Sequence, residues 1–303
     1  NVVVLGEDMA VMGNVFAITQ GFLDEFGPNR VIDTPISESG FTGMAVGMAM
    51  RGLRPVVEWM YDDFITVCLD PVMNQAAKMR YMTGGQVKIP IVFRAPIGAG
   101  RRNAGQHSQC LEALFTHIPG LKVVCPSTGA DAKGLLKSAI RCDDPVVFLE
   151  HKLLYAKKEQ IPDGEYLIPL GKADVKRPGK DLTILTWSRQ VYFSLEAAET
   201  LAAQGIDAEV VDLRTLVPLD WEAIRASVQK TGNVMVVEEG VRRGGVGAEL
   251  AAEIQEELFD DLDAPVARVA GANIVPPFSP PLEDVMFPHP ADIVAAAHKL
   301  LAK

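Results

Sequence analysis

The stretch "RVIDTPISESGFTGMAVGMAMRGLRPVVEWM", residues 30–60, predicts a strand, a helix and a second strand in turn. A β-branched run (30–33) and an apolar run (55–60) flank a segment of helical length. Two strands joined by a helix form a crossover unit, and its strands lie parallel in one sheet. The stretch therefore predicts a parallel α/β sheet with helices on its faces.

The same alternation extends over residues 1–150, which we interpret as the first domain. Helical spacing covers residues 63–82, where Pro71 must kink or interrupt the helix, and residues 129–141. We expect a mostly parallel sheet with helices on both faces. The predicted strands are 2–6, 30–33, 55–60, 89–95, 121–126 and 145–150.

Residues 151–180 lose this alternation and gather Lys, Pro and Gly, as a connection between domains does. Residues 181–303 then alternate again and predict a smaller α/β domain. Its predicted strands are 182–187, 208–213, 234–239 and 265–271, and its predicted helices are 192–205, 246–258 and 290–302.

Composition excludes several classes of function. The chain has 303 residues and a net charge of -10, so it carries no basic surface for nucleic acid. No apolar run approaches the roughly 20 residues that span a bilayer, and we expect no membrane partner. The four cysteines form no C-x-x-C pair, which favours reduced thiols and a cytoplasmic location, or the mitochondrial matrix in a eukaryote. Because Asn1 leads directly into a strand, we expect a preceding segment, with any targeting peptide, in the full protein.

Glycine pairs at 98–100 and 245–247 do not predict a dinucleotide site. Both lack the third glycine of G-x-G-x-x-G, and neither follows the first strand. The segment 244–249 is at least as typical of a glycine-rich turn that caps a helix.

Glu38 stands at the start of a helix with glycines at 40, 43, 47 and 52. Each glycine costs a helix about 0.5 to 1 kcal/mol relative to alanine. Small residues spaced by three or four allow a backbone, a subunit or a flat ligand to approach, although tight helix packing explains them about as well. A carboxylate in the first turn also favours the helix dipole, so capping by Glu38 or Ser37 is the alternative to a functional role.

His107 lies in a polar loop, "NAGQHSQC" (103–110), after the predicted strand 89–95. In a parallel sheet this loop falls at the carboxyl edge, where ligands gather. A hydrogen-bonded structural histidine is the alternative. The other histidines have no ligand-like partner at i+3 or i+4, so they predict no metal site.

Over essentially its whole length the chain resembles the beta subunits of the thiamine-diphosphate-dependent decarboxylase component of 2-oxo acid dehydrogenase complexes. The likeness is carried by "GEDMAVMGNVF" (6–16), residues 30–60, "QHSQCLEALFTHIPGLKVVCPST" (106–128), residues 131–155 and "VVEEGVRRGGVGAEL" (236–250). It implies a pyrimidine-binding domain and a transketolase-like C-terminal domain. It also implies an alpha subunit that completes each active site in an α2β2 heterotetramer.

The resemblance gives particular residues a role. Glu38 matches the glutamate that hydrogen-bonds the aminopyrimidine ring of the cofactor, and Met60 and Phe64 match positions that pack against this ring. His107 matches a histidine beside the reacting centre that is thought to assist acyl transfer. The family's monovalent-cation site maps to Ile91, Ala139, Cys142 and Asp144, where the thiol of Cys142 suits a hard cation poorly.

The sequence contains no G-D-G stretch, which single-chain relatives use to hold the diphosphate and magnesium. We therefore expect the alpha subunit to hold the magnesium, and the lone chain to bind the cofactor weakly and to self-associate.

The function implied is oxidative cleavage of pyruvate or acetoin, with acyl transfer to a lipoyl-bearing acyltransferase. Gln106 before His107 favours a small acyl donor over a branched-chain 2-oxo acid. A scaffold subunit without cofactor is disfavoured by Glu38. A self-contained transketolase-like synthase is disfavoured by the missing G-D-G and the short length.

Overall fold

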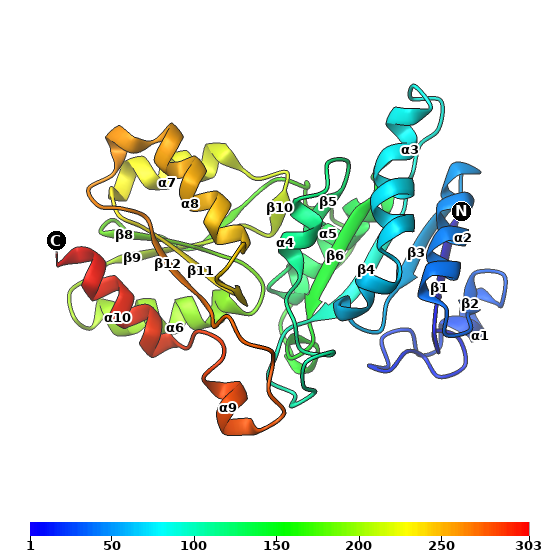
Figure 1. Ribbon diagram of the computed structural model, residues 1–303, viewed down its shortest axis with the longest axis horizontal. Helices are drawn as coiled ribbons and strands as arrows, with labels where there is room; N and C mark the ends of the chain where they lie inside the picture. Colours follow the sequence, from blue (N-terminus) through cyan, green and yellow to red (C-terminus); the bar gives the residue numbers. More distant parts are fainter. Residues whose placement is uncertain (303) are drawn as a thin grey trace.

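The computed structural model describes residues 1–302, which form two α/β units side by side with the termini at opposite ends (Figure 1). The first sheet has seven strands in the order β10-β5-β6-β4-β3-β1-β2. All of its pairs are parallel except β10 with β5. Its strands are β1 (Val2–Gly6), β2 (Val31–Asp33), β3 (Arg54–Glu58), β4 (Val92–Ile97), β5 (Lys122–Val124), β6 (Val146–His151) and β10 (Thr215–Val217).

Helices were predicted where α2 and α5 lie, whereas α1 and α4 were not predicted. The segment predicted as one helix broken at Pro71 is a 3₁₀ helix, a π-helical turn that begins at Pro71, and a short α-helix. The elements are α1 (Phe22–Phe26), α2 (Glu38–Met50), η1 (Asp62–Val67), η2 (Pro71–Ala76), α3 (Ala77–Met82), α4 (Glu112–Thr116), α5 (Gly129–Arg141) and η3 (Leu154–Ala156).

The second sheet has five strands in the order β12-β11-β8-β9-β7 and is parallel except for β7 at its edge. Its strands are β7 (Asp174–Arg177), β8 (Leu182–Thr186), β9 (Ala208–Asp212), β11 (Val234–Val241) and β12 (Ala267–Gly271). Its helices are α6 (Gln190–Ala202), α7 (Trp221–Thr231), α8 (Val246–Glu257), η4 (Phe259–Asp261), α9 (Pro280–Asp284) and α10 (Pro290–Leu301). The two-domain α/β class predicted from the sequence is thus confirmed.

The alternation did not predict two edge strands, one of which joins the units. Strand β7 lies inside residues 151–180, the predicted connection, and pairs antiparallel with β9. Strand β10 comes from the C-terminal half, yet it pairs with β5 of the first sheet. Both are short edge strands, and such strands lack the long apolar run of a central parallel strand.

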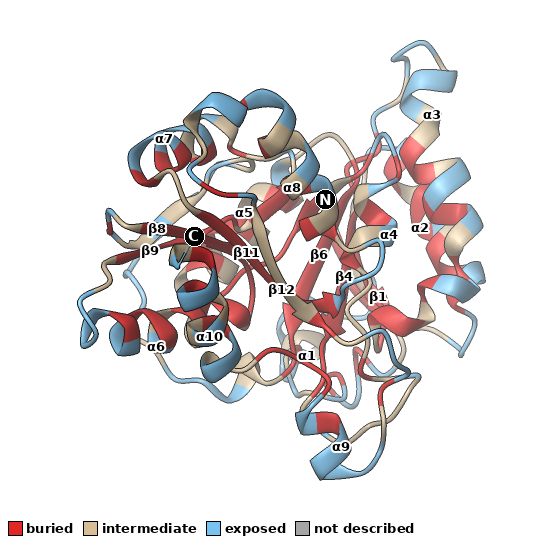
Figure 2. Ribbon diagram, turned by 60° about the vertical axis from the view of Figure 1, so that its left-hand side comes forward, coloured by how far each residue is buried: buried red, intermediate tan, exposed pale blue. Residues whose placement is uncertain are grey.

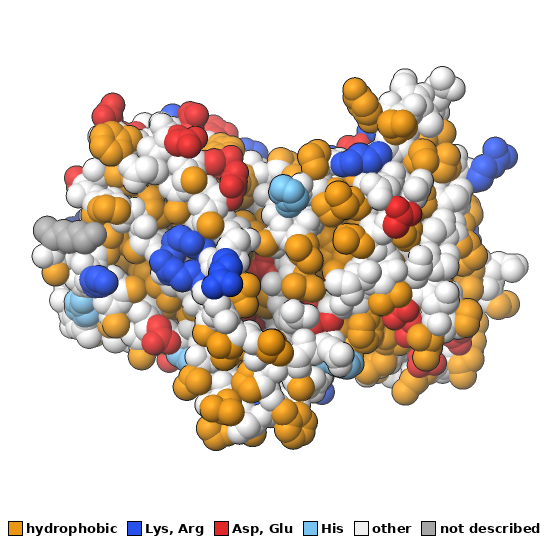
Figure 3. Space-filling view, viewed as in Figure 1, with side chains coloured by type: hydrophobic (Ala, Val, Ile, Leu, Met, Phe, Trp, Pro, Cys, Tyr) orange, Lys and Arg blue, Asp and Glu red, His pale blue; other side chains and the backbone are white. Residues whose placement is uncertain are grey.

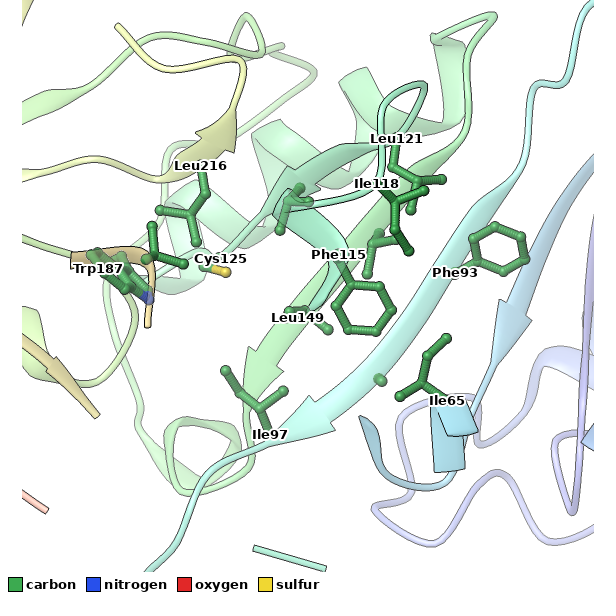
Figure 4. Close-up of a cluster of buried hydrophobic side chains, with 14 of the residues drawn as sticks. Ile65, Phe93, Ile97, Phe115, Ile118, Leu121, Cys125, Leu149, Trp187 and Leu216 are labelled. Atoms are coloured by element: carbon green, nitrogen blue, oxygen red, sulfur yellow. The ribbon is translucent and has the colours of Figure 1, made fainter. Parts of the chain in front are cut away.

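One continuous hydrophobic core spans both units. Phe115 and Cys125 of the first unit lie in the same cluster as Trp187 and Leu216 of the second (Figure 4). Each is at most 3% exposed, and burying a large apolar side chain contributes about 1.5 to 3 kcal/mol. The shared core fixes one unit against the other.

Most strands are buried, the edge strands β7 and β12 are only partly buried, and the outer faces of the helices are exposed (Figure 2). Within residues 1–302 no helix is long and apolar enough to cross a membrane. The segment around α9 is an exception to the polar surface, since hydrophobic side chains gather there (Figure 3). They include Val275, Phe278, Leu282 and Val285, which are 57–78% exposed.

Candidate active site

The predicted site residues lie on segments that follow the carboxyl ends of β2, β3 and β4. Glu38 opens α2, after the turn that leaves β2. Met60 and Phe64 follow β3, and His107 is carried by the loop between β4 and α4. Since parallel strands end at one edge of a sheet, these separate sequence positions share that edge.

Glu38 is 8% exposed. Within residues 1–302 no side chain caps α2, and none donates a hydrogen bond to the Glu38 carboxylate. Ser37, the other candidate cap, makes no such bond either. Although the residue is buried, its carboxylate oxygens are not closed off from solvent. The structure therefore gives Glu38 no capping bond that would explain its place.

Glu38 contributes to the raised pKa values of two other residues, Glu7 and Cys68. Burial is the main cause that raises the pKa of Glu7, and the nearby Glu38 carboxylate raises it further. Burial likewise raises the pKa of the Cys68 thiol to about 12, although the Thr42 hydroxyl opposes the shift and Glu38 adds to it. Glu7 follows β1 and Cys68 follows η1.

Aromatic rings cluster around His107. Its ring centroid lies 4.5 Å from that of Tyr61 and 5.5 Å from that of Phe64, both edge-to-face. The Tyr61 and Phe64 centroids are 5.9 Å apart. Met60, next to this cluster in the chain, is 9% exposed, whereas Phe64 and His107 are half-buried. The structure thus brings the predicted residues Phe64 and His107 into contact.

Three buried charges lie beneath the His107 loop. Burial raises the pKa of Asp62 well above its usual range, and the adjacent Asp63 raises it further. Asp63 accepts a hydrogen bond from Gln109 Nε2 at 2.8 Å. Burial lowers the pKa of Lys152, whose Nζ donates to the main-chain carbonyl of His107.

The predicted site is an open edge rather than a closed cavity. A cavity of about 810 Å³ lies on the sheet face between β1, α1 and α5, and Glu38, Phe64 and His107 do not line it. On α2, a methyl group added at Gly43 or Gly47 would meet nothing within 4 Å. Packing within the described chain therefore does not explain Gly43 and Gly47, although a Cβ at Gly40 would lie 2.8 Å from the Ser37 hydroxyl.

The residues of the predicted cation site are held by protein contacts. The carbonyl oxygens of Ile91 and Ala139 accept main-chain hydrogen bonds of 2.9 and 3.1 Å. The carbonyl of Cys142 accepts from Arg54 at 3.0 Å, and the Asp144 carboxylate pairs with Arg80 and Lys122. Cationic side chains thus occupy oxygens that a monovalent ion would need, and occupancy of this site stays a prediction.

Several residues at this edge were not predicted from the sequence: Glu7, Tyr61, Asp62, Lys152 and Glu239. A signal did exist for Lys152, since "HK" follows the strand 145–150 directly and so falls at the same carboxyl edge as His107.

Comparison with known proteins identifies the family to which the chain belongs. The family described as "Transketolase, pyrimidine binding domain" matches residues 1–158, and "Transketolase, C-terminal domain" matches residues 171–293. The beta subunit of the pyruvate dehydrogenase E1 component of Rhizobium meliloti is 47% identical over 100% of this chain and 66% of its own length. The chain belongs to this family of transketolase-like dehydrogenase beta subunits.

Other members agree. The beta subunit of the acetoin:2,6-dichlorophenolindophenol oxidoreductase of Cupriavidus necator is 48% identical over 99% of this chain and 92% of its own. The mitochondrial pyruvate dehydrogenase E1 subunit beta-1 of Arabidopsis thaliana is 49% identical over 98% of this chain and 83% of its own. Among solved structures, a "split gene transketolase, inactive beta4 tetramer" superposes with a TM-score of 0.81, at 25% identity over 99% of this chain and 92% of that one.

Thiamine diphosphate is the cofactor of this family, and the residues present fit its pyrimidine end. Glu38 offers a carboxylate without a donor, and the Phe64 ring lies half-exposed at the same edge. Residues 1–302 contain no group of three or more His, Cys, Asp or Glu placed to hold a metal ion.

Proposed function

We propose that this chain is the beta subunit of a thiamine-diphosphate-dependent dehydrogenase component, active only with an alpha subunit. Together they oxidatively cleave pyruvate or acetoin and transfer the acyl group to a lipoyl domain. The names of the relatives from Rhizobium meliloti and Cupriavidus necator support these substrates. The observation that carries the proposal is Glu38, a buried residue whose hydrogen-bonding capacity the described chain leaves unused.

The residues divide the work at the site. Thiamine diphosphate supplies the carbon nucleophile and the electron sink of the reaction. Glu38 would share a proton with a ring nitrogen of the pyrimidine, while Met60 and Phe64 would pack against the ring. His107, held against Tyr61, acts beside the reacting centre and assists acyl transfer.

The alpha subunit supplies what this edge lacks. It holds the diphosphate and magnesium, and it covers the glycine face of α2, where Gly43 and Gly47 have open space. The α2β2 assembly then delivers the acyl group to the lipoyl-bearing acyltransferase component. The similar split-gene transketolase assembly of beta chains is described as inactive, which supports the need for a second kind of subunit.

Glu38→Gln tests the role of the carboxylate. The amide keeps the shape of the side chain but cannot share a proton in the same way, so we expect normal assembly and a loss of turnover of about 10²- to 10⁴-fold. Glu25→Gln, an exposed acid of α1, is the matched control and should keep full turnover. Turnover of the assembled Glu38→Gln variant within about threefold of wild type would contradict the proposal, because acid-base assistance is worth far more than that.

Substrate preference needs a separate measurement. We expect the reconstituted complex to favour pyruvate or acetoin over 2-oxoisovalerate. Steady-state rates with the three compounds decide between them, and a clear preference for 2-oxoisovalerate would assign the chain to the branched-chain enzymes instead. Absence of turnover with all three, in a well-assembled complex, would favour a scaffold subunit.

A further inference from the structure

Residues 98–110 form the His107 loop, which leaves β4 and leads to α4. The Gly98 N–H donates to the Gln109 carbonyl at 2.8 Å and closes the base of the loop. Around the His107 ring, the described chain supplies the edges and faces of Tyr61 and Phe64 but no hydrogen bond to a ring nitrogen. The position of this imidazole is therefore set mainly by the backbone of its loop.

Lys152 supports the middle of the loop. Its side chain is buried, with the residue only 2% exposed, and Nζ donates to the carbonyl of His107 itself. The ammonium also lies 5.2 Å from the centroid of the Tyr61 ring. Burial lowers the pKa of Lys152, and the nearby acidic groups Asp62, Asp63 and Glu239 oppose that shift.

Glu239 supports the start of the loop from the C-terminal domain. Its Oε1 accepts from the Ala99 N–H at 2.8 Å and lies 3.1 Å from His151 Nε2. The Leu153 N–H donates to His151 Nδ1 at 3.2 Å, so the ring hydrogen of His151 is on Nε2 and points to Glu239. Burial opposes ionisation, yet His151, Arg189 and the Ala99 N–H together lower the pKa of Glu239 to about 2.

The far end of the loop is held by η1. Asp63 accepts from Gln109, and Asp62 Oδ2 accepts from the Leu111 N–H at 2.9 Å. Only the middle and the start of the loop therefore depend on groups outside the β3–η1 segment. Lys152 directly follows β6 and Glu239 lies on β11, in different sheets. Arg102 of the loop also pairs with Glu283 and Asp284 of α9.

We propose that Lys152 and Glu239 are positioning residues for His107, and that the C-terminal domain acts on the reaction through Glu239. This inference rests on the proposed function of His107. Neither residue touches the reacting atoms. Lys152 fixes the main chain at His107, and Glu239 fixes the turn from which the loop departs, so that the ring stays between Tyr61 and the site.

The test uses Lys152→Met and Glu239→Gln, each assembled with the alpha subunit, with Lys152→Arg as the conservative rescue. The control is Arg214→Met, which removes another buried pair between the two units, Arg214 with Asp131 at 2.9 Å, away from the loop. Hydrogen exchange of residues 99–110 reports the loop, and kcat and KM report the reaction.

We expect Lys152→Met and Glu239→Gln to speed hydrogen exchange of residues 99–110 by about tenfold or more. A displaced His107 should lower kcat by about 10- to 100-fold with little change in KM. Lys152→Arg should keep both the exchange rate and kcat closer to their wild-type values than Lys152→Met does. Arg214→Met should leave the hydrogen exchange of residues 99–110 unchanged.

The inference would be overturned if Lys152→Met and Glu239→Gln left the hydrogen exchange of residues 99–110 unchanged. It would also be overturned if these variants sped up this exchange but kept the wild-type kcat, while His107→Ala lowered kcat. Unchanged kcat in His107→Ala itself would instead refute the proposed role of His107, and the premise of positioning would fall with it. Because the two variants act on different parts of the loop, either one decides the question if the other fails to assemble.

Discussion

Gly98→Ala should damage the protein well beyond its small change in volume. The Gly98 φ is +94°, and a Cβ there would lie 2.0 Å from Nε2 and 2.3 Å from Cδ2 of His151. Carbon contacts are normally 3.5–4.0 Å, so the His151 ring must move by more than 1 Å. The ring cannot make that move while it keeps its 3.1 Å contact with Glu239.

The size of the loss follows from two contributions. An L-residue in the left-handed region costs roughly 1 to 2 kcal/mol. A lost hydrogen bond to a charged group costs roughly 1.5 to 3 kcal/mol. Gly98→Ala should therefore lower the free energy of unfolding by roughly 2.5 to 5 kcal/mol. Gly52→Ala is the matched control, because Gly52 has a φ of +89° with nothing within 4 Å of its Cβ position, and it should cost only the first contribution.

Urea unfolding followed by tryptophan fluorescence measures both variants, together with His151→Ala and the double variant Gly98→Ala/His151→Ala. Removing the imidazole makes room for the new methyl group, so the double variant should be less destabilised than the sum of the single variants by about 1.5 to 3 kcal/mol. If Gly98→Ala were no less stable than Gly52→Ala, or if the effects were additive, the contact between Gly98 and His151 would not explain this glycine.

Three further predictions concern pH, His107 and the lone chain. Burial raises the pKa of Glu112 to about 7 from 4.5, so the native state binds the extra proton and loses stability as the pH rises through this interval. The free energy of unfolding of Glu112→Gln should therefore rise relative to that of wild type between about pH 5 and pH 8, by at most about 3 kcal/mol. Urea titrations at each pH measure this, and a difference in free energy that does not change with pH would contradict the raised pKa. His107→Ala should fold normally and lose turnover in the complete complex, whereas unchanged turnover with a large drop in Tm would make His107 a structural residue. The isolated chain should bind thiamine diphosphate with magnesium only weakly in calorimetric titration, and micromolar binding would contradict the divided site.

Much of the fold could be predicted because the inner strands of both parallel sheets are largely buried, fully in β8 and in part in β1. Such strands need continuous apolar runs, and the runs 2–6 and 182–187 agree with β1 (Val2–Gly6) and β8 (Leu182–Thr186) within one residue. Helix α5 was predicted with both of its ends, since Thr128 and Arg141 frame an amphipathic segment; the Thr128 hydroxyl accepts from the Asp131 N–H.

The edge strands and the support of the site could not be predicted in this way. β7 and β10 are short, and their partners lie far away in the sequence, so neither carries a local signal. Helix α7 is amphipathic and ends at Gly232, so its signals were present but not used. Glu239 belongs to a buried strand more than a hundred residues from Ala99, and only the fold brings the two together.

The pairing of β10 with β5 bears on how genes of this family can recombine. A crossover placed in residues 151–180 would separate β5 from the strand that covers its edge, with Val123 and Val124 facing Val217 and Thr215 across the ladder. It would also separate Phe115 from Trp187 within one core. A chimera joined there combines two halves that evolved with different neighbours. Its tendency to aggregate should therefore depend on how well the side chains of residues 213–219 pack against β5 of the other parent. The point that looks most permissive in the sequence is therefore a poor place to exchange domains between relatives.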